Sequence, residues 1–171
     1  AMIALYVIIF FLIISIFAGV IAPYSACIKQ DAANRLQGPS AEHWFGTDEL
    51  GRDILTRIIY GARISMSVGL IAICISLIGG VALGAVAGYY GGALDNIIMR
   101  VMDVFMSIPS MLLAIAVVAS LGPGIVNIMI AVGMAMVPGY SRVVRSAVLS
   151  VRNKEFVQAA KAIGDNDFSI I

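Results

Sequence analysis

Residues Ile64 to Leu94 read ISMSVGLIAICISLIGGVALGAVAGYYGGAL and contain no Asp, Glu, Lys or Arg. A helix needs about 20 apolar residues to cross a hydrocarbon core of about 30 Å, so this run is long enough to span a membrane. Two further runs without charged residues, 1–28 and 104–141, exceed the same length. The chain is therefore predicted to be an integral membrane protein.

The composition supports this class. Hydrophobic residues make up 61% of the chain and charged residues only 12%, with a mean hydropathy of +1.00, and so few charges cannot cover a soluble surface of this size. A net charge of +1 without a basic patch gives no reason to expect a nucleic-acid partner. Cys27 and Cys74 lack metal-ligand spacing, and we expect no metal and no cofactor.

The apolar runs predict an all-α, polytopic membrane helix bundle. Gly122-Pro123-Gly124 supplies a turn that divides the third run into two short crossings. Pro109 and Pro138 predict kinks within the third and fourth spans. The four transmembrane helices are expected at about residues 2–22, 64–88, 98–121 and 124–140.

An interfacial helix is predicted between the first two spans. Apolar residues recur at helical spacing from Ile54 to Ile64, which is typical of an amphipathic helix on a membrane surface. Thr47 is expected to cap a helix whose first turn carries Asp48 and Glu49. We therefore divide the chain into residues 1–63, with the first span and a loop, and residues 64–171, the start of a transmembrane core.

The second span carries small residues at every fourth position, which lie on one helix face and let another backbone approach closely. They serve either static helix packing or a surface on which helices move, and sequence leaves both open. The small residues are Ala72, Ser76, Gly80, Gly84 and Gly88.

In the third span, Asp103 is expected either to pair locally with Arg100 or to relay protons.

A polar segment follows the fourth span. A short helix is predicted from about Lys154 to Ile163, with Gly164 as a left-handed C-cap. Asp165 or Asp167 is expected to cap a second helix that begins near Phe168. Such a helix either lies in a groove on a partner protein or rests on lipid. Its apolar residues are Phe156, Val157, Ala159, Ala160 and Ile163.

No catalytic constellation is evident. The chain has one histidine and no Gly-rich loop ending in Gly-Lys-Ser/Thr, so we expect neither catalytic residues nor an ATPase site. Energy for transport would then come from a partner protein.

Three stretches resemble one known family. They are the stretch from His43 (HWFGTDELGRD, then Tyr60-Gly61-Ala62-Arg63), the stretch from Gly88 (GYYGG, on to Pro109) and residues 155–164. The chain is similar to the permease subunit of binding-protein-dependent ABC importers, in the dipeptide, oligopeptide and nickel branch. The third stretch resembles the family's cytoplasmic Glu-Ala-Ala loop, although Gln158 stands where the family has glutamate.

The resemblance implies an importer of the plasma (inner) membrane. Its expected partners are two ATP-binding subunits, a second permease chain, an extracytoplasmic solute-binding protein and the lipid around the spans. The resemblance places the tail from Arg142 in the cytoplasm and the loop Lys29–Arg63 outside. It also implies that the chain is truncated after the start of the docking loop. The implied ATPase-docking residues are Glu155, Phe156, Gln158, Ala159, Ala160 and Gly164.

Two other functions stay open. An ATP-independent secondary transporter or channel needs ionisable residues at mid-membrane depth, and the second and fourth spans contain none. A membrane scaffold without transport activity is the other. The cargo is expected to be a peptide, with nickel or another small solute as the alternative.

Overall fold

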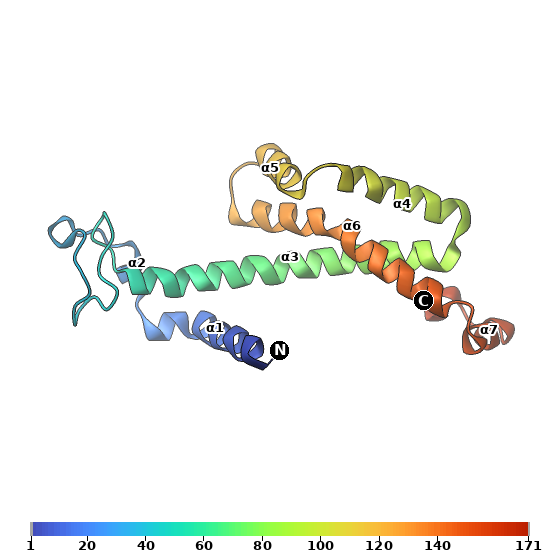
Figure 1. Cartoon of the computed structure of the whole chain (residues 1–171), viewed down its shortest axis with the longest axis horizontal. Helices are drawn as coiled ribbons and strands as arrows, with labels where there is room; N and C mark the ends of the chain where they lie inside the picture. The colour runs from blue at the N-terminus through green and yellow to red at the C-terminus, as the bar shows by residue number, and fades with distance from the viewer. Residues whose placement is uncertain (1, 171) are drawn as a thin grey trace. The chain divides into compact units, whose positions relative to one another are not determined.

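The computed structural model describes residues 2–170, apart from the side chain of residue 26, and confirms an all-α membrane protein. Within these residues the only β-type pairing is an isolated bridge between Thr47 and Asp53. The helices, shown in Figure 1, are α1 (Met2–Ile21), α2 (Tyr24–Ile28), the 3-10 helix η1 (Ala32–Asn34), α3 (Ile54–Tyr90), α4 (Gly92–Ser107), α5 (Ser110–Leu121), α6 (Ile125–Val151), α7 (Glu155–Ala162) and α8 (Asp167–Ile170).

The chain divides into two compact units, residues 1–67 and 68–171. In the first unit, α1 has apolar residues on all sides, and only Ser15 and Ala18 are buried. A helix that is hydrophobic all round and not covered by protein requires lipid around it. This confirms the first predicted span.

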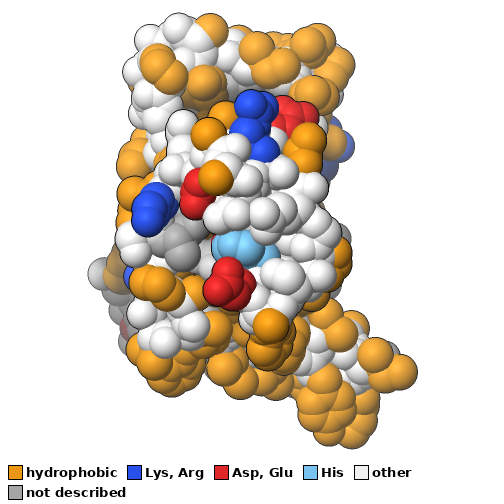
Figure 2. Space-filling model, turned by 90° about the vertical axis from the view of Figure 1, so that its left-hand side faces the viewer, with side chains coloured by type: hydrophobic (Ala, Val, Ile, Leu, Met, Phe, Trp, Pro, Cys, Tyr) orange, Lys and Arg blue, Asp and Glu red, His pale blue; other side chains and the backbone are white. Residues whose placement is uncertain are grey.

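The loop of residues 29–53 is organised by side-chain hydrogen bonds. The Thr47 hydroxyl accepts from the Gln37 amide (2.9 Å) and donates to the Asn34 carbonyl (2.5 Å). The Asp48 carboxylate accepts from the amides of Leu50 (2.8 Å) and Arg52 (2.9 Å). Acidic and basic side chains lie intermixed on the face shown in Figure 2.

The expected cap at Thr47 is wrong. The helix starts later, at Ile54, and Asp53 caps it by accepting from the Thr56 amide (2.7 Å) and hydroxyl (2.6 Å). An aspartate immediately before a helix satisfies the free amides of the first turn. Residues 54–63 form the first turns of α3, so the predicted interfacial segment is continuous with the second span.

Helices α3 and α6 of the second unit pack side by side and run in the same direction. Gly133 faces Ala72, Tyr140 faces Gly80, and Val148 lies against Gly88. Because residue numbers rise together on both helices, the chain between them must return to the starting side. The segment from α4 to α5 makes that return (Figure 1).

The third span is not one kinked helix. Helices α4 and α5 meet at an angle of 91°, and Ile108 and Pro109 both have extended backbone angles. Proline cannot donate an amide hydrogen bond and disfavours helix in the residue before it. The parallel packing of α3 and α6 makes this bent pair a broken span, since a re-entrant loop would begin and end on one side.

The fourth span is longer than predicted. Helix α6 passes through Pro138 and ends at Val151, well beyond the expected end near residue 140. Between residues 2 and 170, three helices are long and apolar enough to cross a membrane, or four crossings are present when the bent pair counts as one span. The prediction of about four crossings is therefore confirmed.

Candidate functional site

The docking segment, defined here as residues 155–168, consists of α7, a turn and the start of α8. Gly164 has a φ of +82°, and it donates to the Lys161 carbonyl (3.1 Å) while Asp165 donates to the Ala160 carbonyl (3.1 Å). These two bonds form a Schellman motif, which confirms the predicted left-handed cap. The next helix begins after Asn166, whose side-chain oxygen accepts from the Phe168 amide (3.5 Å).

The apolar residues of α7 do not all share one environment, contrary to the predicted single face. Val157 is buried at 6% exposure, whereas Phe156 and Ile163 are 64% and 84% exposed. Ala159 is exposed on the same helix face, three residues after Phe156. Phe168 of α8 is 92% exposed. We call Phe156, Ala159, Ile163 and Phe168 the exposed apolar set.

The other residues predicted to dock an ATPase also belong to this segment. Glu155, Gln158 and Gly164 are exposed, and Ala160 is half-buried. The Gln158 side chain donates to the Asn153 carbonyl (3.1 Å), which holds it along the helix start. All six predicted residues thus lie in one short stretch, five of them accessible to a partner.

Tyr89, near the end of α3, joins the docking segment to α3 within the second unit. Its hydroxyl donates to the Asp167 carboxylate at 2.5 Å, and the Lys161 ammonium lies 4.4 Å from the centre of its ring. The Tyr89 side chain is itself buried, at 8% exposure. One tyrosine therefore contacts both α7 and α8, a connection that the sequence analysis missed.

Arg142 and Arg145 of α6, and Arg152 at its C-cap, attach this helix to neighbouring elements. Arg145 makes a bidentate pair with Asp95 of α4 (2.5 and 2.6 Å), and Arg142 pairs with Asp103 (2.5 Å). Arg152 donates to the Gly88 carbonyl at 3.0 Å. The predicted local pair between Asp103 and Arg100 is wrong, because the partner of Asp103 comes from another helix.

The small residues of α3 lie against α6. A Cβ atom on Gly80 would lie 2.4 Å from the Tyr140 Cβ, and one on Gly84 would lie 2.5 Å from the Ser141 carbonyl oxygen. Ser76 and Ser141 are fully buried. The two backbones approach so closely that only small side chains fit between them.

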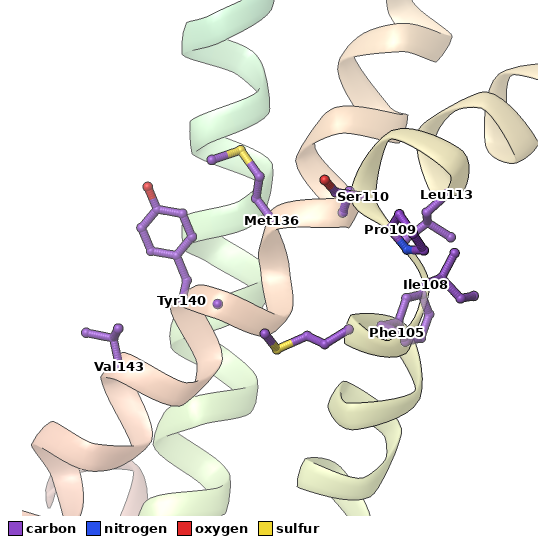
Figure 3. A pocket seen from close by; sticks show the side chains of 11 residues that line it. Phe105, Ile108, Pro109, Ser110, Leu113, Met136, Tyr140 and Val143 are labelled. Atoms are coloured by element: carbon purple, nitrogen blue, oxygen red, sulfur yellow. The ribbon is translucent and has the colours of Figure 1, made fainter.

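A pocket of about 660 Å³ lies beside the break between α4 and α5. Figure 3 shows Phe105, Ile108 and Pro109 on one side of it and Met136 and Tyr140 of α6 on the other. Its lining is mainly apolar, with hydroxyl groups from Ser110 and Tyr140. The pocket therefore lies between the broken span and α6.

Two carboxylates of the 29–53 loop, Asp48 and Asp53, have lowered pKa values. Desolvation raises the pKa of Asp48, but hydrogen bonds from the Arg52 and Leu50 amides and from the Arg52 guanidinium outweigh it and lower the pKa to about 2. Desolvation also raises the pKa of Asp53. Hydrogen bonds from Thr56 and His43, together with the charge of His43, outweigh this effect and lower the pKa of Asp53. Both carboxylates therefore stay ionised in mildly acidic solution.

Comparison with protein families gives two matches. Residues 80–171 match the model described as a binding-protein-dependent transport system inner membrane component. Residues 1–39 match the N-terminal transmembrane domain of oligopeptide transport permease C. The first match covers more than half of the chain and includes the small residues from Gly80 onward, the α4–α6 ion pairs and the docking segment.

Curated relatives agree with these matches. The chain is 50% identical over all of its 171 residues to the dipeptide transport system permease protein DppC of Alkalihalophilus pseudofirmus, covering 56% of that protein. It is 41% identical to DppC of Bacillus subtilis, covering 53%, and 45% identical to the glutathione transport system permease protein GsiD of Escherichia coli, covering 56%. The chain spans about half the length of these relatives. It belongs to the family of binding-protein-dependent transport system inner membrane components.

Proposed function

We propose that this chain is a membrane-spanning subunit of an ATP-driven importer and that the docking segment binds a separate ATPase. The observation that carries the proposal is the exposed apolar set on α7 and α8, next to a transmembrane core of the matched family. An amphipathic helix with protruding aromatic and small residues suits a groove on a partner protein. Residues 64–171 form the start of the transmembrane core in this proposal.

The topology supports a cytoplasmic docking segment. If α3, the broken span and α6 each cross once, the 29–53 loop and the docking segment lie on opposite sides of the membrane. The tail side, with Arg100 and the basic residues from Arg142 onward, carries six Lys/Arg against five in the loop, and the more basic side is usually cytoplasmic. The loop then faces an extracytoplasmic solute-binding protein.

The contacts suggest how ATPase motion would reach the spans. Movement of α7 and α8 would pull on Tyr89 at the end of α3, through the Asp167 hydrogen bond and the Lys161 contact. Arg152 would carry the same movement to the Gly88 carbonyl. The broken span, tied to α6 by Asp95 and Asp103, can respond beside its pocket.

The partners in this proposal are two ATP-binding subunits, a second permease chain and a solute-binding protein. The cargo is a peptide, which the printed names of the dipeptide and glutathione relatives support. The chain supplies no energy itself. Selection among peptides falls mainly to the solute-binding protein, because the pocket beside the broken span offers few polar groups.

Cross-linking in the complete transporter tests the docking. In a background without native cysteines, Ala159→Cys on the exposed face should form a disulfide with cysteines placed along the rim of the ATPase groove. Val157→Cys on the same helix is the control and should not react, because Val157 is buried. Equal labelling of both positions, or no ATPase cross-link at Ala159, would contradict the proposed docking.

A further inference from the structure

A second pocket lies in the first unit, between α2 and the first turns of α3. It has a volume of about 600 Å³, and its wall includes two tyrosines whose rings are 5.1 Å apart, Tyr24 and Tyr60. The Tyr60 hydroxyl donates to the Ala22 carbonyl at the end of α1 (2.9 Å), which fixes the ring. Arg57, Arg63 and Ile64 also line the pocket.

The pocket carries an excess of positive charge. Arg57 contacts the Asp48 carboxylate, but that carboxylate also pairs with Arg52, so it offsets only part of the Arg57 charge. Arg63 is exposed and makes none of the ion pairs found among residues 2–170. A guanidinium presents paired N–H donors whose spacing matches two oxygens of a phosphate group. An anionic ligand is therefore favoured over a neutral or cationic one.

The position of the pocket at the membrane surface indicates that the anion is a lipid phosphate. Arg63 is the last charged residue before the run 64–94, and α1, which is apolar on all sides, ends close by at Ile21. Both helices leave the hydrocarbon at this level, where tyrosine rings are enriched. Phospholipid headgroups occupy this level around any spanning helix, so lipid phosphate is always present there.

We propose that this pocket binds the headgroup of an anionic phospholipid. Arg63 pairs with the phosphate, and Arg57 lies on the same wall as a second donor. The Tyr24 and Tyr60 rings contact the glycerol region, and the acyl chains lie along the apolar surface of α1. The proposal depends only on membrane insertion and is independent of the proposed transport function.

Native mass spectrometry of the complete transporter tests this site. Delipidated protein in detergent is titrated with phosphatidylglycerol or with phosphatidylcholine of the same acyl chains. We expect retention of phosphatidylglycerol and a loss of about five-fold in its affinity in Arg63→Gln, the effect of one arginine at a lipid surface. Arg63→Lys, which keeps the charge, should lose less than Arg63→Gln.

Arg100→Gln is the control, because it removes the same charge from an exposed position on α4 outside the pocket. It should leave this affinity unchanged. Equal affinity of Arg63→Gln and the unmodified protein, or equal retention of both lipids, would overturn the proposal. Displacement of the lipid by millimolar inorganic phosphate would assign the pocket to a free anion, and displacement by a dipeptide would assign it to a peptide carboxylate; either outcome also overturns it.

Discussion

Gly84→Ala should weaken the packing of α3 on α6, and its effect can be worked out from the structure. The added Cβ would lie 2.5 Å from the Ser141 carbonyl oxygen, 2.9 Å from the Val144 Cβ and 3.1 Å from the Arg145 amide nitrogen. Two of these are backbone atoms that no side-chain rotation can remove. Helix α6 must therefore shift away from α3 along its whole contact.

The expected cost follows from comparison with Gly69→Ala on the same helix. A Cβ at Gly69 meets no atom within 4 Å, so that variant should only gain the helix preference of alanine over glycine, up to about 1 kcal/mol. Gly84→Ala gains the same amount but adds an overpacking cost of about 1–3 kcal/mol. The difference between the two variants isolates the packing cost.

Reversible unfolding of the full-length protein, titrated from mild detergent into SDS and followed by circular dichroism, measures both variants. We expect Gly84→Ala to be about 1–3 kcal/mol less stable than Gly69→Ala. A difference below about 0.5 kcal/mol, the usual error of such comparisons, would refute the close contact between α3 and α6.

Three further outcomes are expected. Tyr89→Phe removes the hydrogen bond to Asp167 and should lower uptake while ATPase copurification is unchanged; normal uptake would show that this bond does not contribute to transport. Gly164→Val forces a β-branched residue to a φ of +82° and should abolish coupled uptake without affecting membrane insertion, whereas unchanged ATP-dependent uptake would count against the docking role. The lowered pKa of Asp48 (about 2) means that its stabilisation of the loop is present above its ordinary pKa and is lost as the pH falls toward 2; pepsin should therefore cut the 29–53 loop slowly at pH 4 and faster near pH 2, and Asp48→Asn should be cut quickly at both.

The sequence predicted most of what depends on length and composition. Charge-free runs located the first, second and fourth crossings, and the spacing of the docking segment together with Gly164 predicted its helix and cap. These features are local, because a span needs only enough apolar residues and a cap only one permissive glycine. Both can be identified within a window of about 20 residues.

Features that depend on distant partners were missed. Asp95 and Asp103 pair with Arg145 and Arg142, which lie 50 and 39 residues away, and nothing in one sequence specifies such pairs. Thr47 is a good capping residue by type, but its hydroxyl is used within the loop, which leaves Asp53 to cap α3. Local preferences were overridden where another part of the chain supplied a better partner.

The length of α3 has a mechanical consequence. Its 37 residues extend over roughly 55 Å, nearly twice the thickness of a hydrocarbon core. An uninterrupted helix of this length is a stiff lever whose tips lie far from any pivot inside the bilayer. A tilt of about 5° around a pivot at its middle would move each tip by about 2 Å, so this one helix can turn a small rearrangement near the pivot into a larger displacement at its ends without bending.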